Sequence, residues 1–138
     1  MNKLHSIMAM LVTILFSMPS FAQEQKLNPE RVRNQEAVYN ASEKTITITA
    51  EAPTQTEYDW DTYVLYDLTH ISYITIKRHF PGEEWPAEEL GRINSPKPGA
   101  VIAFVDNNIE VDRQYEYSIT VFVDDLHSQQ SYLQVYTG

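Results

Sequence analysis

The chain has 138 residues, which is enough for one domain with a hydrophobic core and too few for two domains of ordinary size. Its 10 Lys and Arg residues against 19 Asp and Glu residues give a net charge of −9. This charge argues against a nucleic-acid-binding protein, because such proteins present a basic surface to phosphate. The absence of cysteine excludes disulfides, thiolate metal ligands and a cysteine nucleophile.

The first 22 residues have the pattern of a secretory signal peptide, although an N-terminal core helix is the alternative. Lys3 supplies the positive charge, Ile7–Phe16 is an apolar run of ten residues, and Ser20-Phe21-Ala22 places small residues at the −3 and −1 positions of a cleavage site. The run is shorter than the roughly 20 residues that cross a membrane as a helix, and no second run of that length follows. We therefore expect cleavage after Ala22, export to the medium, the periplasm or the cell surface, and no transmembrane anchor after cleavage.

The expected mature chain comprises residues 23–138. It loses Lys3 and keeps every acidic residue, so that its net charge becomes −10. Residues 23–29 (QEQKLNP) are polar and are predicted to be a tether. Residues 30–138 are predicted to form one folded domain, whose core must be sufficient without disulfides.

Five segments have the alternation, or the β-branched and aromatic content, of β-strands. They are Thr45–Ala50, Ile71–Arg78, Val101–Val105, Tyr115–Val123 and Tyr132–Tyr136. The first segment places Ile46, Ile48 and Ala50 on one face, and the second places Ile74 and Ile76 on one face. These residues are the predicted core.

Turn residues separate the predicted strands, at Pro81-Gly82, Pro98-Gly99 and Asp106-Asn107-Asn108. The one passage with helical character is Trp85–Leu90, where Pro86 would lie in the first turn of a helix of a single turn. Short strands without intervening helices indicate an all-β protein that folds as an antiparallel β-sandwich.

The segment Asp106–Val121 resembles the corner between strands E and F of a fibronectin type III domain. Ile109 is followed six positions later by Tyr115, which is the family's spacing between an apolar residue and the tyrosine that begins strand F. In such a tyrosine corner the ring packs in the core while the hydroxyl bonds to a backbone group upstream. Ala52-Pro53, after the strand at 45–50, is also similar to the family. The resemblance implies an immunoglobulin-like sandwich of about seven strands over residues 30–138, with structural roles for Ile109 and Tyr115.

This chain departs from the family at the end of strand B, where Ala50 replaces the usual tryptophan. A cavity of that size would be strongly destabilising, so a large side chain is expected to fill the space. Trp60 and Trp85 are the candidates, and the prediction is that Trp60, which is nearer in sequence, is buried there.

No catalytic or metal-binding pattern is present in the sequence. His70, His79 and His127 have none of the spacings of two-histidine metal sites, and there is no G-x-S-x-G sequence. Asp59-x-Asp61 begins like a calcium loop, but Val64 stands where that loop needs glycine and His70 where it needs glutamate. We expect a protein that is not an enzyme and that has no metal, cofactor or catalytic residue.

The most unusual segment is the 17-residue connection Thr54–His70, because such loops are usually shorter than about six residues. It mixes aromatic and acidic residues, namely Tyr58, Trp60, Tyr63 and Tyr66 with Glu57, Asp59, Asp61 and Asp67. In the favoured interpretation Trp60 fills the space beside Ala50, while Tyr63, Leu65 and Leu68 extend the core. In the other, Tyr58, Trp60 and Tyr63 form a ligand-binding surface.

These features predict an exported, non-catalytic module for protein binding, adhesion or spacing between domains, as the resemblance to fibronectin type III domains implies. The alternative is a carbohydrate-binding accessory module of a polysaccharide-degrading system, which would use the aromatic segment at 54–70. The expected partner is an extracellular protein or a glycan, and not a nucleic acid.

Overall fold

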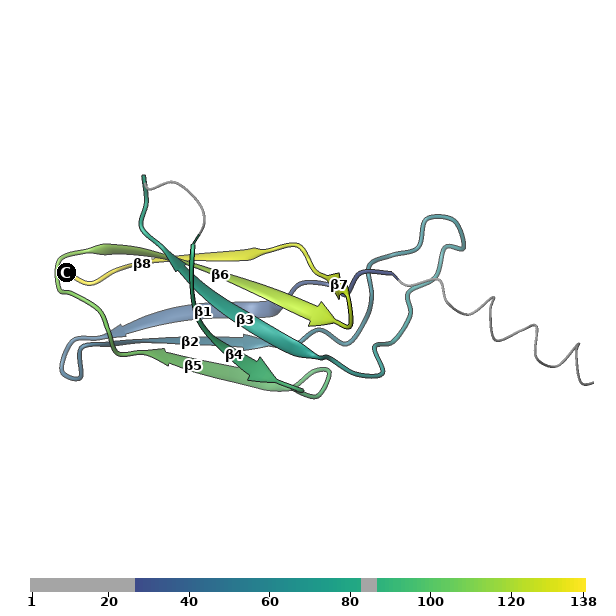
Figure 1. Ribbon diagram of the computed structural model, residues 1–138, viewed down its shortest axis with the longest axis horizontal. Helices are drawn as coiled ribbons and strands as arrows, with labels where there is room; N and C mark the ends of the chain where they lie inside the picture. The colour runs from purple at the N-terminus through teal and green to yellow at the C-terminus, as the bar shows by residue number, and fades with distance from the viewer. Residues whose placement is uncertain (1–26, 83–86) are drawn as a thin grey trace, which may run out of the picture.

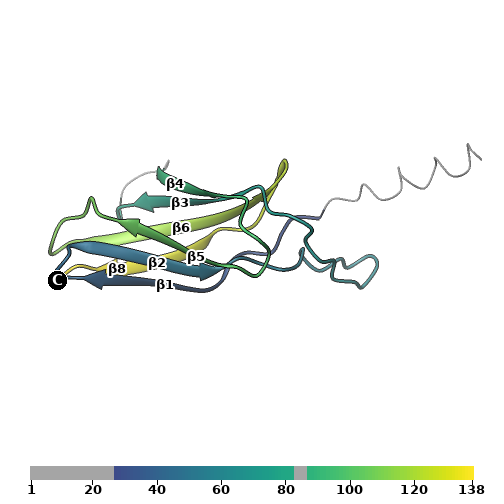
Figure 2. The same cartoon turned by 90° about the horizontal axis from the view of Figure 1, so that it is seen from below.

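Two antiparallel β-sheets pack face to face in the computed structural model, which describes residues 27–82 and 87–138 (Figure 1). One sheet contains β1 (Arg33–Asn40), β2 (Thr45–Glu51) and β5 (Val101–Asp106), in the order β1-β2-β5. The other has the order β4-β3-β6-β7, with β8 also paired to β6. Its strands are β3 (Tyr73–His79), β4 (Glu88–Asn94), β6 (Gln114–Val123), β7 (Leu126–His127) and β8 (Ser131–Tyr136). Figure 2 shows β3, β4 and β6 lying over β1 and β2. The predicted class is confirmed: the fold is an immunoglobulin-like antiparallel β-sandwich.

The buried core lies between the sheets and follows the alternation of the strands. In β2 the side chains of Ile46, Ile48 and Ala50 are each at most 2% exposed, and Ile74 and Ile76 of β3 are fully buried, as predicted. β6 contributes the largest part of the core, with Tyr115, Tyr117, Ile119 and Val121. Burial of these apolar side chains is the main favourable term for the fold.

Two edge strands, β1 and β4, do not follow from the sequence patterns. β1 has mixed polarity, and only Ala37 and Tyr39 pack against the core. Glu88–Leu90, predicted to belong to a helical turn, instead begin β4, where Glu88 pairs with Arg78 of β3. Pairing with a neighbouring strand overrides a weak local helical preference.

The predicted signal peptide, residues 23–26 of the predicted tether, and Trp85 lie outside the described residues. No helix in the described ranges is long and apolar enough to cross a membrane. Asn28 and Pro29, predicted to be tether, belong to the fold. Pro29 is buried and pairs with Thr56, and the Asn28 carbonyl accepts a hydrogen bond of 2.8 Å from the Glu57 N–H. Backbone pairing therefore extends the N-terminal boundary of the domain from residue 30 to at least Asn28.

The two ends of the sandwich differ. At one end, in the connection between β5 and β6, Tyr115 is 1% exposed and its hydroxyl accepts a hydrogen bond of 2.6 Å from the Glu110 N–H. Ile109 is partly buried and packs against the core. Both residues thus have the geometry expected of a tyrosine corner. At the other end, the connection between β2 and β3 projects beyond both sheets (Figure 1, right).

Candidate functional site

The connection between β2 and β3 folds back on itself as an irregular hairpin, which we call the β2–β3 hairpin (residues 54–68). Near its base the Leu68 N–H donates a hydrogen bond of 2.8 Å to the Thr54 carbonyl. Further out, the Thr56 N–H donates one of 2.9 Å to the Tyr66 carbonyl. The chain therefore runs outward from the sandwich and returns beside itself, instead of folding over the core.

The tip of the hairpin is a turn organised by Asp59. The Tyr63 N–H donates a hydrogen bond of 2.7 Å to the Asp59 carbonyl, and Tyr63 has a positive φ of 58°. The Asp59 Oδ1 accepts hydrogen bonds from the N–H groups of Asp61, at 2.9 Å, and Thr62, at 3.3 Å. Hydrogen bonds from the Thr62 side chain and the Asp61 backbone lower the pKa of Asp59 from its ordinary value of 3.8. Asp59 is therefore ionised at neutral pH and holds the turn through its side chain.

The prediction that Trp60 fills the space beside Ala50 is wrong. Trp60 is 76% exposed and Tyr63 is 72% exposed, while Ala50 is buried in a cluster of apolar residues that does not include Trp60. Of the residues expected to extend the core, Leu65 is also exposed, and only Leu68 packs against the core. The physical reason is the pairing within the hairpin. Hydrogen bonds between its two arms carry the tip out beyond both sheets (Figure 1).

Tyr58 and Trp60 form an aromatic pair at the tip. Their ring centroids are 4.7 Å apart and their planes make an angle of 77°, so that the edge of one ring meets the face of the other. Tyr58 is 36% exposed. With Tyr63 these are the three residues of the predicted ligand-binding surface, and the structure presents all three at the same end of the hairpin. Neighbouring exposed side chains add to the apolar surface, namely Val64, Leu65 and Tyr66.

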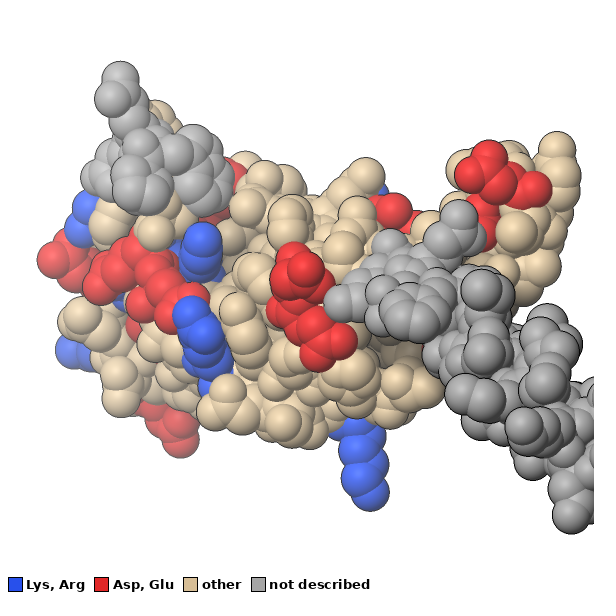
Figure 3. Space-filling model, turned by 45° about the vertical axis from the view of Figure 1, so that its right-hand side comes forward, with Lys and Arg blue, Asp and Glu red and all other residues tan. Residues whose placement is uncertain are grey.

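The hairpin is acidic as well as aromatic. Residues 54–70 contain four carboxylates, those of Glu57, Asp59, Asp61 and Asp67, and no Lys or Arg. In Figure 3 the projecting part at the upper right shows red acidic atoms among neutral ones and no blue basic atoms on this face. The tip therefore combines rings with uncompensated negative charge.

The hairpin is attached to the sandwich on two sides. On one side it pairs with the N-terminal segment, through the hydrogen bond between Glu57 and Asn28. On the other side His70 Nε2 lies 3.0 Å from Asp124 Oδ1, in the turn between β6 and β7. The Asp124 N–H in turn donates a hydrogen bond of 2.8 Å to the Ser72 hydroxyl. These contacts fix the base of the hairpin.

An open depression of about 430 Å³ lies beside the hairpin. Its lining residues are Glu30, Arg31, Arg33, Glu57, Tyr58 and Gln129. The two arginines are already engaged, because Arg33 pairs with Glu30 at 2.8 Å and Arg31 donates a hydrogen bond to Gln129. The depression therefore adds no free positive charge next to the acidic tip.

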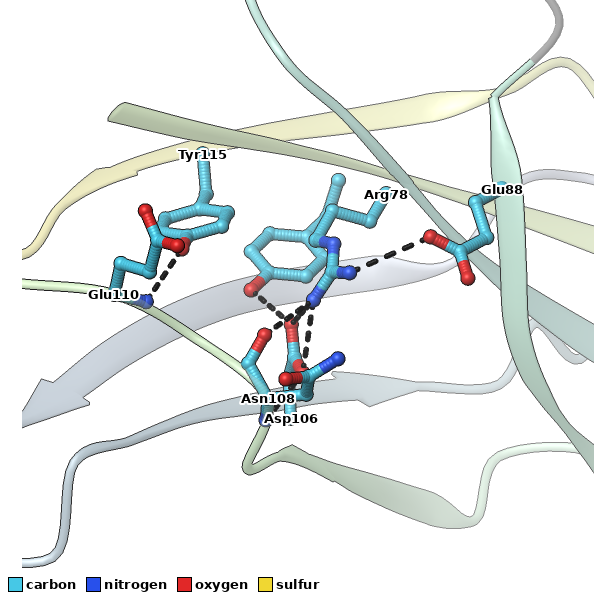
Figure 4. A network of polar contacts seen from close by, with 7 residues as sticks. Arg78, Glu88, Asp106, Asn108, Glu110 and Tyr115 are labelled. Carbon is cyan, nitrogen blue, oxygen red and sulfur yellow. Dashed lines mark hydrogen bonds and ion pairs between the residues drawn. The ribbon is translucent and has the colours of Figure 1, made fainter. Parts of the chain in front are cut away.

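A second polar cluster, at the opposite end of the sandwich, was not predicted (Figure 4). Arg78 of β3 is 8% exposed and pairs at 2.9 Å with Asp106, which is 4% exposed and comes from the other sheet. The Tyr117 hydroxyl donates a hydrogen bond of 2.7 Å to Asp106, and burial followed by this hydrogen bond raises the pKa of Tyr117 above its ordinary value. The signal in the sequence is that alternation places Arg78 on the same inward face as Ile74 and Ile76. A buried arginine requires a carboxylate.

The Arg78 cluster is a link between the two sheets. Arg78 also donates to the carbonyl of Asn108 at 2.9 Å and lies 3.4 Å from Glu88. Its charge is thus matched by carboxylates that come from β4 and β5. Within residues 27–82 and 87–138, no group of three or more His, Asp or Glu side chains is arranged to hold a metal ion.

Comparison with known proteins does not assign the chain to a protein family. It matches no model of a protein family, and no curated protein is significantly similar to it in sequence. The function is therefore argued from the geometry of the surface.

Proposed function

We propose that this protein is an exported, non-catalytic binding module of the fibronectin type III kind, and that it binds a partner protein through the tip of the β2–β3 hairpin. The observation that carries the proposal is the 76% exposure of Trp60 on a turn that Asp59 holds in place. An exposed tryptophan beside exposed Tyr63 is unfavourable in water, and aromatic side chains are enriched where proteins bind one another.

Two features support the fibronectin type III type. The chain has the sandwich architecture that this family shares with immunoglobulin domains. It also has the bond from the Glu110 N–H to the hydroxyl of buried Tyr115, which pins the crossover between the sheets. Export is supported by the signal-peptide pattern of residues 1–22.

The ring geometry favours a protein partner over a glycan. The planes of Tyr58 and Trp60 are 77° apart, so the two rings form a ridge and not a flat platform on which successive sugar rings could stack. A ridge fits a pocket of a partner protein, where buried aromatic anchors contribute most of the binding energy. The carbohydrate-binding alternative is supported by the exposure of Trp60 and Tyr63 and by the nearby carboxylates, which can accept hydrogen bonds from sugar hydroxyls.

The experiment compares three forms of residues 23–138: the natural sequence, Trp60→Ala, and Tyr136→Ala. Tyr136 is 55% exposed on β8, pairs with Gln114 at the end of the sandwich opposite the hairpin, and is the matched control. Each form is immobilised and exposed to the extracellular proteins of the producing organism, and each is applied to a glycan array. We expect one protein to be retained by the natural form and by Tyr136→Ala, and to be lost from Trp60→Ala.

The other outcomes are distinct. Binding to a glycan that disappears in Trp60→Ala, without a retained protein, would replace the proposal with the carbohydrate-binding alternative. Retention that is equal in Trp60→Ala and the natural form would contradict a role for the hairpin.

A further inference from the structure

The acidic residues of the hairpin differ from those elsewhere in the chain. All five arginines have partners outside the hairpin, since Arg31 bonds to Gln129 and the other four pair with carboxylates. The pairs are Arg33 with Glu30, Arg78 with Asp106 and Glu88, Arg92 with Glu89, and Arg113 with Glu110. Among the described residues no cation pairs with Glu57, Asp59, Asp61 or Asp67.

Elsewhere the chain repeatedly places an arginine in contact with both an aromatic ring and a carboxylate. The Arg92 guanidinium lies 4.4 Å from the centre of the Tyr73 ring, while its Nε lies 3.2 Å from Glu89. In the same way Arg113 lies 3.8 Å from the centre of the Phe80 ring and 3.0 Å from the Glu110 carboxylate. In this arrangement the ring face attracts the cation while the carboxylate accepts its hydrogen bonds.

Buried Arg78 shows a more distant version of the arrangement. It pairs with Asp106 at 2.9 Å and lies 5.7 Å from the Phe80 ring and 5.8 Å from the Tyr115 ring. A guanidinium with a ring and a carboxylate therefore occurs three times within this one domain.

The hairpin tip supplies two of the three groups. Trp60 presents most of its ring to solvent, and Asp61, the next residue, is exposed and has no bond from its carboxylate to any described residue. Tryptophan is the best of the aromatic rings for a cation. The guanidinium is the group that is missing.

We infer that the hairpin binds an arginine side chain of its partner, which lies over the ring of Trp60 and is paired with the carboxylate of Asp61. This inference rests on the proposed function, because it names the chemistry of the partner at the same surface. The partner segment is basic, and the net charge of −10 of the expected mature chain speeds its approach at low salt. Arginine suits the site better than lysine, because its planar group stacks on a ring and forks onto a carboxylate at the same time.

The test uses residues 23–138 with Trp85→Phe, so that Trp60 is the only tryptophan and its fluorescence reports directly on the tip. The probe is a hexa-arginine peptide. Its neutral control is hexa-citrulline, which has nearly the shape of arginine without the charge, and its second control is hexa-lysine, which has the charge without the planar group. We expect hexa-arginine to change the Trp60 emission in a saturable way, hexa-lysine to bind about tenfold more weakly, and hexa-citrulline to have no effect.

A matched pair of variants separates a specific site from general attraction between opposite charges. Glu57→Gln/Asp61→Asn removes two charges from the hairpin, and Glu36→Gln/Glu43→Gln removes two charges from exposed positions of β1 and the turn that follows it. We expect the hairpin pair to weaken binding of hexa-arginine by about tenfold more than the control pair. Circular dichroism checks that both variants keep the fold.

Equal weakening by the two pairs, or equal binding of hexa-arginine and hexa-lysine, would overturn the inference. These results leave the proposed function intact if a natural partner is still lost from Trp60→Ala. The proposed function fails separately, when no partner depends on Trp60 at all.

Discussion

The backbone N–H of Glu110 donates a hydrogen bond of 2.6 Å to the hydroxyl of Tyr115, whose side chain is 1% exposed. This bond ties the loop after β5 to the first residues of β6, and so joins the two sheets at one end. We expect Tyr115→Phe to lower the free energy of unfolding by about 1–3 kcal/mol, because the Glu110 N–H loses its partner. Urea denaturation measures the change, with Tyr136→Phe, at a half-exposed ring on β8, as the control. An unchanged midpoint and slope for Tyr115→Phe would show that the hydrogen bond between Glu110 and Tyr115 does not stabilise the fold.

The Arg78–Asp106 pair joins the sheets inside the protein. We expect Asp106→Ala to lower the free energy of unfolding by about 3–5 kcal/mol, because it leaves the buried Arg78 charge without its main partner. Glu89→Ala breaks the exposed pair with Arg92 and should cost less than about 1 kcal/mol. Chemical denaturation of both variants gives the comparison. Similar small effects would show that the sheets do not depend on the buried pair.

Trp60 contributes a surface and not core packing. We expect Trp60→Ala to change the free energy of unfolding by less than about 0.5 kcal/mol, because its side chain is 76% exposed. In the Trp85→Phe background the emission of Trp60 should have the long wavelength of a hydrated indole. Fluorescence and thermal unfolding check both statements. Short-wavelength emission together with a large loss of stability would place Trp60 in the core.

The Asp59 turn should be sensitive to acid only at low pH. Hydrogen bonds lower the pKa of Asp59 in the folded chain below the ordinary value of 3.8. Its contribution is therefore fully present above pH 3.8 and is lost as the pH falls through the lowered pKa. NMR titration of the Asp59 carboxyl, with hydrogen exchange at the Asp61 N–H, measures this.

Two variants test the carboxylate of Asp59 further. Asp59→Asn keeps a side-chain oxygen as acceptor, so we expect it to keep the turn at neutral pH and to remove the acid dependence. Asp59→Ala removes the acceptor and should speed exchange of the Asp61 and Thr62 N–H groups. Equal exchange in the natural chain and Asp59→Ala would show that the side chain does not hold the turn.

The signal-peptide pattern predicts the N-terminus of the exported protein. Mass spectrometry of the protein from outside the cytoplasm should show a chain that begins at Gln23, either free or cyclised to pyroglutamate. The described fold begins at residue 27, and Pro29 is already buried, so every described residue remains after this cleavage. A chain that retains residues 1–22 would contradict the predicted export by cleavage.

The sequence by itself determined the class of the fold and much of its core. Alternation is a local property, and it identified β2, the buried face of β3 and the tyrosine-rich face of β6 because their inward residues are strongly apolar. Alternation did not predict the edge strand β1, because only Ala37 and Tyr39 of this strand pack against the core. Alternation did not predict β4 either, because pairing with β3 overrides the weak helical preference of this segment.

Tertiary structure alone decided the place of Trp60. Composition and spacing were compatible with a tryptophan turned inward beside Ala50 or outward at a tip, because a long loop of mixed aromatic and acidic residues favours neither direction. Pairing of Thr56 with Tyr66 and capping of the turn by Asp59 send the chain away from the core. These contacts depend on where the two arms of the hairpin lie in space. They therefore cannot be read from the periodicity of the sequence.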